Sequence, residues 1–216
     1  MVQKISLKEA ERRAFAVNFQ DGLLDIFIGC VVLEFAVAPL LSRYLGDYLS
    51  VAVFLPFFGL LFLAIRWLRQ HVIIPRVGRV EYGAWRKVRL MRFNLMMFVL
   101  LVLALFLGAL STVDFGLVTG WMVAARFSLV VLVLFGISSY FLNVPRLYVY
   151  GVLAALSPMA GEWLYVNLKV PHHGFPVTFG LTSGIMIATG VGLFVRLLRQ
   201  HPVPAENNAA SEMAAE

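Results

Sequence analysis

The chain has 216 residues, of which 61% are hydrophobic and only 14% are charged, and its mean hydropathy is +0.85. A soluble domain averages roughly 45–50% apolar and about 25% charged residues. A soluble core of this size could not cover so much apolar surface, whereas a lipid bilayer solvates it. The composition therefore indicates a multi-spanning membrane protein and excludes a disordered chain, a disulfide scaffold and a free nucleic-acid-binding domain.

Six stretches are long and apolar enough to cross a bilayer, which requires about 20 residues per helix. We expect an all-α fold, a polytopic transmembrane helical bundle within residues 22–199. Its six predicted spans are about 22–40, 48–68, 93–110, 121–142, 147–168 and 174–195. Five or seven spans are the alternatives to this count.

The basic residues predict the orientation, because loops rich in Lys and Arg stay on the cytoplasmic side. With the N-terminus inside, 15 of the 18 basic residues fall in cytoplasmic segments. Only Arg43 and Lys169 fall outside, and Arg126 lies within the fourth span. We therefore expect a cell-membrane protein with both termini in the cytoplasm. This topology explains the net charge of +6 without a nucleic-acid partner.

The first span has one feature of a cleavable signal peptide, a small-residue triplet at 36–38. Pro39 follows the triplet directly, and Asp25 and Glu34 interrupt the apolar stretch, so we expect a retained helix. The single cysteine, Cys30, lies in this helix, and no intrachain disulfide can form.

Three segments outside the spans are predicted to lie in the cytoplasm. Residues 1–21 form an amphipathic segment suited to the inner leaflet, and residues 200–216 lack a packable pattern and are expected to be a mobile tail. The basic loop 69–92 is expected to begin with a strand-like or hairpin segment and to end as a helix. Its cations are predicted to contact anionic lipid head groups, and they are Arg76, Arg79, Arg86, Lys87, Arg89 and Arg92.

Small residues recur every four positions on the sixth span, at Gly180, Gly184, Ala188 and Gly192. This spacing lets two membrane helices approach closely. We interpret it as a helix-packing stripe, whose partner is either inside this chain or in a second copy in a homo-oligomer. A looser seam with seven-residue spacing lies on the first span, at Gly22, Gly29 and Ala36.

The second and sixth spans end in similar hexapeptides, at residues 66–71 and 196–201. Glu34 and Glu162 also lie at comparable depths in the helices that begin the two hairpins. Either spans 1–2 and 5–6 are related hairpins in one orientation, as repeats in transporters are, or two cytoplasmic helix ends converged on arginine-rich sequence.

Three ionisable residues, Glu34, Arg126 and Glu162, are predicted to share one layer in the outer half of the bilayer. Charges at membrane depth are costly, so they pair or serve a function, and an arginine between two carboxylates satisfies most of their hydrogen bonds. Three interpretations are open: a water-accessible cation or proton site, a structural ion-pair network, or charges that are simply exposed near the interface. Asp25, nearer the inner surface, is expected to meet water, Asn94 or a cytoplasmic arginine.

The candidates for metal binding and catalysis are weak. His172 and His173 lie on an outer loop and could complete a zinc or copper site with Glu162 or Asp114. A solvated or pH-responsive loop is the favoured interpretation, so no metal or other cofactor is expected. The sequence contains no metalloprotease, Walker, nucleophile-elbow or Cys-x-x-Cys motif, and the chain is not predicted to be an enzyme.

Residues 21–29 and 75–82 resemble segments of uncharacterised prokaryotic multi-spanning membrane proteins. The resemblance implies no activity and no functional residues. The leading hypothesis is a non-catalytic, multi-pass integral membrane protein whose basic cytoplasmic face docks lipid head groups or a cytoplasmic protein. The competing hypothesis is a small transporter or channel that uses Glu34, Arg126 and Glu162.

Overall fold

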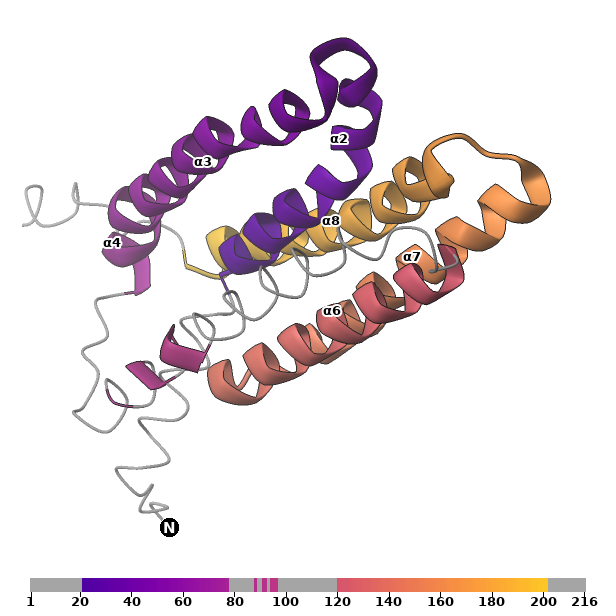
Figure 1. The fold of residues 1–216 in the computed structure, drawn as a ribbon. Helices are drawn as coiled ribbons and strands as arrows, with labels where there is room; N and C mark the ends of the chain where they lie inside the picture. Colours follow the sequence, from indigo (N-terminus) through magenta and orange to yellow (C-terminus); the bar gives the residue numbers. More distant parts are fainter. Residues whose placement is uncertain (1–20, 78–87, 89–90, 93, 97–119, 202–216) are drawn as a thin grey trace, which may run out of the picture.

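The computed structural model describes residues 21–77, 88, 91–92, 94–96 and 120–201. Every regular element in these ranges is helical (Figure 1), which confirms the all-α class. The long helices are α2 (Leu23–Ala52), α3 (Phe54–Leu68), α6 (Gly120–Leu142), α7 (Arg146–Leu168) and α8 (Phe175–Gln200). The short elements are η1 (Arg69–Ile73), α4 (Ile74–Val77) and η2 (His172–Gly174). Most of the third predicted span, the N-terminal segment to residue 20 and the tail from residue 202 lie outside the described residues.

Four helical stretches in the described part of the chain are long and apolar enough to cross a membrane: Leu23–Gly46, Tyr48–Arg76, Gly120–Leu142 and His172–Gln200. They match the first, second, fourth and sixth predicted spans. Helix α7 has 23 residues, but polar residues such as Ser157, Glu162 and Asn167 lower its hydropathy below that of the other four. The structure is therefore an all-α bundle with four candidate membrane spans and one further long helix.

The chain departs from the sequence predictions at two places in its first hairpin, the turn between α2 and α3 and the end after α3. Helix α2 continues past residue 40 to a kink at Gly46, whose φ of 77° and ψ of 167° are available at low cost only to glycine. At the other end, the chain stays helical to Val77, past residue 69 where the basic loop is expected to begin. The strand-like segment suggested by the alternation of Val77, Arg79 and Glu81 lies mostly outside the described residues. Pro75 has no N–H to donate to the preceding turn, and that turn is wound as the π-helix η1 instead of a regular α-helix.

Helix α8 is the centre of the bundle: α2 and α7 pack against it, α6 packs against α7, and α3 follows α2 (Figure 1). The approach of α2 to α8 is close because Gly22 has no side chain. A Cβ there would lie 2.1 Å from the carbonyl oxygen of Gly190. Gly29 packs on Ile187 in the same way, and Ala36 is buried further along α2. The seven-residue seam of the first span is thus the face that α2 presents to α8.

The buried face of α8 is not the stripe expected from the sequence. Gly184, Ala188 and Gly192 are exposed, and a Cβ on either glycine would meet no described atom within 4 Å. Only Gly180 approaches α2. Residues four apart are rotated by about 40° on a helix, so a stripe of four turns through about 120° and leaves the contact. The buried positions follow a different line: Phe179, Thr182, Ser183, Met186, Gly190 and Leu197.

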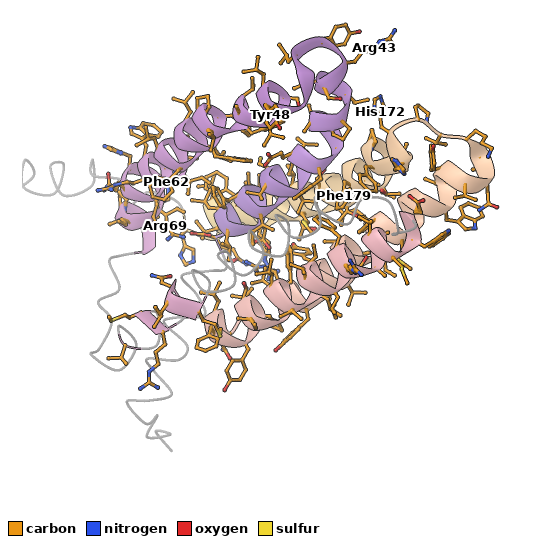
Figure 2. The ribbon with its side chains drawn as sticks, in the orientation of Figure 1. Arg43, Tyr48, Phe62, Arg69, His172 and Phe179 are labelled. Atoms are coloured by element: carbon orange, nitrogen blue, oxygen red, sulfur yellow. The ribbon has the colours of Figure 1, made fainter. Side chains whose placement is uncertain are left out.

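Phe179 marks the middle of the core and is 1% exposed. Its ring contacts Phe35 of α2, Phe127 of α6 and Phe175 of its own helix, with centroid distances of 5.4, 6.1 and 5.6 Å. Figure 2 shows it on α8, in the interior of the bundle. One aromatic side chain therefore joins three helices.

The helix ends collect at two opposite ends of the bundle. Leu23, Ile73 and Leu197 form one apolar cluster, which brings together the start of α2, the end of η1 and the last turns of α8. We call this the arginine end, and its arginines are Arg66, Arg69, Arg76, Arg146, Arg196 and Arg199. The opposite end holds the start of α6 and the α7–α8 connection, and we call it the histidine end after His172 and His173. Figure 2 shows Arg69 at the first, and Arg43 and His172 at the second.

Candidate functional site

Two aspartates near the start of α2 hold arginines from two other elements. The Oδ2 atom of Asp21 accepts a hydrogen bond from Nη2 of Arg69 at 2.6 Å, and Oδ1 of Asp25 accepts one from Nε of Arg146 at 2.7 Å. The carboxylates are 2% and 0% exposed, respectively. A negative charge is favoured at a helix N-terminus, and pairing offsets much of the cost of burying it. These two ion pairs tie α2 to η1 and to α7.

Asp25 meets one of the three partners expected from the sequence, an arginine that the charge count assigns to the cytoplasm. Asn94 is exposed and makes no hydrogen bond with Asp25 among the described residues. The second carboxylate oxygen of Asp25 and the hydroxyl of Tyr150, one turn along α7 from Arg146, are both buried without a hydrogen-bond partner in the described part of the chain. The α2–α7 junction is therefore a polar spot within an apolar bundle.

The arginine end also presents cations that face outward. Arg66, Arg196 and Arg199 are exposed and have no carboxylate partner among the described residues. Next to Arg66, the ring of Trp67 stacks on the imidazole of His71 at a centroid distance of 5.1 Å. Exposed cations beside an exposed indole ring are typical of a membrane–water interface.

Only part of the predicted head-group set can be placed. Arg76 is half-buried in α4 and Arg92 is exposed. The other four members, Arg79, Arg86, Lys87 and Arg89, lie outside the described residues. Arg66, Arg196 and Arg199 are not in that predicted set. The sequence counts them only among the cytoplasmic basic residues.

Exposed Trp and Tyr side chains form two layers. The layer at the arginine end contains Trp67, Tyr140 and Tyr148, and the layer at the histidine end contains Tyr44, Tyr48, Trp121, Trp163 and Tyr165. Tyr48 and Trp67 are 19 positions apart, as are Trp121 and Tyr140. That spacing is about 28 Å along a helix, close to the roughly 30 Å thickness of the hydrocarbon core. The band between the layers exposes large apolar side chains such as Leu55, Leu60, Leu63, Leu129, Leu132, Val152, Leu156, Leu181 and Ile185.

No ion pair joins Glu34, Arg126 and Glu162 in the described residues. Arg126 is exposed, because the face of α6 that turns inward carries Ala124 and Phe127 instead. Glu34 is half-buried on α2 and pairs with no described cation. The structure thus gives Glu162 a different partner from the one expected.

That partner is a histidine of the α7–α8 connection. The Nδ1 atom of His173 lies 2.9 Å from Oε2 of Glu162, which is 6% exposed, and its ring lies 4.2 Å from the ring of Tyr165. The other carboxylate oxygen, Oε1, approaches the first residue of α6, since a Cβ on Gly120 would lie 2.1 Å from it. The start of a helix favours negative charge. Glu162 therefore links three elements at the histidine end.

The connection that carries His173 has an unusual backbone. Lys169, His172 and His173 have φ values of 56°, 56° and 52°, in a region where a residue other than glycine costs roughly 1–3 kcal/mol. Gly174 also has a positive φ, and a Cβ on it would lie 2.7 Å from the carbonyl oxygen of Gly161. The connection is held against α7 by direct backbone contact and by the Glu162–His173 pair.

Among the described residues, no three His, Cys, Asp or Glu side chains lie close enough to hold a metal ion. Asp114, which the sequence suggested as a further ligand, lies outside the described residues.

Comparison of the chain with protein-family models, with curated proteins and with solved structures finds no match in any of the three. The resemblance noted in residues 21–29 and 75–82 is therefore not tied to a family.

Proposed function

We propose that the chain is a non-catalytic, six-span integral membrane protein of the cell membrane that binds anionic lipid head groups at its arginine end, on the cytoplasmic side. The observation that carries this proposal is that Arg66, Arg196 and Arg199, which are exposed and pair with no carboxylate among the described residues, lie at the same end as the aromatic layer of Trp67 and its neighbours. Cations at this depth are within reach of phosphate groups.

The six-span arrangement has two supports. The first is the surface of α7, whose polar residues Ser157 and Glu162 are buried while large apolar side chains such as Val152 and Leu156 are exposed. The second is the position of the chain on either side of residues 78–119. Val77 lies at the arginine end and Gly120 at the histidine end, so the connecting chain has to pass from one end to the other. The predicted span 93–110 is long enough to do so.

Anionic phospholipid suits the arginine end better than a neutral head group does. The planar guanidinium group donates paired hydrogen bonds to phosphate oxygens. A cation near the surface of an anionic leaflet gains about 1 kcal/mol. Two further arginines, Arg69 and Arg146, are engaged by buried carboxylates and hold the end together. Among the described residues, the arginines that hold the bundle together are thus different from the outward-facing arginines Arg66, Arg196 and Arg199.

The test compares two sets of substitutions in the purified full-length chain in zwitterionic nanodiscs, with phosphatidylglycerol added stepwise. We expect phosphatidylglycerol to raise the unfolding temperature of the parent chain. The triple variant Arg66→Gln, Arg196→Gln, Arg199→Gln should lose most of this response, with roughly a fivefold loss of lipid affinity per substitution. The control variant Arg43→Gln, Lys169→Gln removes two cations from the histidine end and should keep it.

The proposal fails if the triple variant responds to phosphatidylglycerol as the parent chain does. It also fails if both sets of substitutions weaken the response equally, since the effect would then reflect net charge. If the parent chain responds to an acidic peptide but not to phosphatidylglycerol, and the triple variant loses that response, the arginine end binds a cytoplasmic protein partner instead of lipid.

The competing hypothesis of a small transporter or channel has less support. It requires Glu34, Arg126 and Glu162 to share one water-accessible site, and the described residues form no ion-pair network among them. Loss of pH-dependent flux on Glu34→Gln substitution, with unchanged folded yield, would favour it.

A further inference from the structure

The corner where α6 begins and α7 turns into α8 contains a buried carboxylate in contact with a half-exposed imidazole. Glu162 is 6% exposed, and the side chain of His173 is 52% exposed. We propose that Glu162, His173 and Tyr165 form a proton-binding site at the histidine end. The proton bound there tightens the α7–α8 connection against α7 and the start of α6.

The strength of the contact depends on the proton because of the atoms that form it. Protonated imidazole donates its Nδ1–H to Oε2 of Glu162 with a full positive charge, and such a charge-assisted bond is stronger than a neutral one. The ring of Tyr165, 4.2 Å away, also favours a cation on His173. Raising the pH removes the charge, so the contact is strongest at low pH and weakens as the pH rises.

The surrounding elements contribute few other charges. Within the described residues, α6 brings the uncharged Gly120 and α8 brings Phe175, whose ring centroid lies 6.0 Å from that of His173. The connection itself carries Lys169 and His172, and among the described residues neither side chain makes a hydrogen bond or ion pair with Glu162 or His173.

Weakening the contact changes the connection because its backbone is held in an unfavourable conformation. The positive φ values of His172 and His173 persist only while neighbouring contacts hold them. When the charge on His173 is lost, the carboxylate of Glu162 still lies against the start of α6. The start of a helix stabilises a negative charge, so this contact remains favourable. Release therefore affects residues 169–174 and leaves the α6–α7 contact in place.

The site takes its proton from the aqueous side opposite the arginine end. His173 lies at the level of the aromatic layer that contains Trp163 and Tyr165, and half of its side chain is exposed. This site is separate from the lipid-binding proposal, because the two lie at opposite ends of the bundle.

The test is hydrogen–deuterium exchange of the full-length chain in nanodiscs at pH 5.5 and pH 8.0, read on peptides that cover residues 169–176. Exchange is expressed as a protection factor relative to the unfolded peptide at the same pH, which removes the intrinsic pH dependence of exchange. We expect protection to fall about fivefold between the two pH values, the difference between a charge-assisted and a neutral hydrogen bond.

Three variants distinguish the site from a general effect of pH. Glu162→Gln keeps a hydrogen-bond acceptor but removes the charge, and His173→Gln removes the titrating group, so both should abolish the pH response. His172→Gln removes the neighbouring histidine, which has the same backbone conformation, and should keep the response. If Glu162→Gln does not fold, His173→Gln still decides the question.

The proposal is overturned if the parent chain shows equal protection at both pH values. It is also overturned if the response survives in His173→Gln, or if it is lost in His172→Gln alone, because the proton would then be bound elsewhere.

Discussion

The close contact between α2 and α8 can be tested by replacing two glycines of α8 with alanine. Gly190 and Gly184 both lie inside the helix, so each substitution brings the same gain in helix propensity, up to about 1 kcal/mol. A Cβ on Gly190 would lie 2.7 Å from the carbonyl oxygen of Gly22 and 2.8 Å from the backbone nitrogen of Ile26, whereas a Cβ on Gly184 would meet no described atom within 4 Å. The difference between the variants therefore isolates the clash.

The atoms that a Cβ on Gly190 would meet include backbone atoms, which cannot move aside without separating the two helices. Overpacking of this kind typically costs about 1–3 kcal/mol. For a chain of this size, 1 kcal/mol shifts the unfolding midpoint by roughly 2–4 °C. We therefore expect Gly190→Ala to unfold several degrees below Gly184→Ala, and Gly184→Ala to unfold at or slightly above the parent temperature.

The assay heats the full-length protein in detergent and measures the folded fraction that remains by size-exclusion chromatography. Gly22→Ala should be at least as destabilising as Gly190→Ala, because Gly22 also has a φ of 76°. Equal midpoints for Gly184→Ala and Gly190→Ala would refute the reasoning. A lower midpoint for Gly184→Ala would assign the packing role to the stripe of small residues instead.

Two further predictions concern the ion pair and the helix register. Asp25→Ala removes the buried carboxylate that binds the guanidinium of Arg146 and should lower the free energy of unfolding by about 3–5 kcal/mol. The double variant Asp25→Ala, Arg146→Ala should lose less than the sum of the two single variants. A double-mutant cycle of unfolding midpoints measures the difference. A Cβ on Gly180 would lie 3.9 Å from that of Ala36, within the range of a disulfide. In a Cys30→Ser background, cysteines at these two positions should therefore cross-link within one chain under mild oxidation, and an interchain dimer or no bond would contradict the α2–α8 register.

The sequence predicts the limits of α6 and α7 well because the apolar run of each helix is followed by a polar residue, Asn143 after α6 and Lys169 after α7. The predicted spans 121–142 and 147–168 differ by one residue at the start from Gly120–Leu142 and Arg146–Leu168. Asn143 and Lys169, which follow the two helices, both adopt a positive φ. Hydropathy says less about the first hairpin, since it ends the first span at residue 40 while α2 stays helical through Arg43 and turns only at Gly46.

For the charged residues, the sequence predicts the chemical type of partner but not which residue it is. Counting along a helix gives the depth of a side chain in the bilayer, but not the direction in which it points around the helix axis. Arg126 has a depth suited to Glu162 and yet points outward, because Phe127 and its neighbours occupy the inner face of α6. Asp25 and Arg146 are 121 positions apart, and only the packing of α2 and α7 on α8 brings them together. The rotation of each helix is fixed by its packing partners, which hydropathy does not encode.

The two similar hexapeptides show the same limit at single-residue resolution. At the second position of each hexapeptide, Trp67 is 56% exposed while Leu197 is 8% exposed. At the fourth position, Arg69 binds Asp21, whereas Arg199 is exposed and has no carboxylate partner among the described residues. The hairpins α2–α3 and α7–α8 do run in the same direction, since the starts of α2 and α7 meet through Asp25 and the chain returns to the same end after α3 and α8. Their last helices nevertheless turn different faces toward the bundle. A duplicated hairpin would be expected to bury corresponding positions, so this difference favours convergence of two arginine-rich helix ends on one membrane surface.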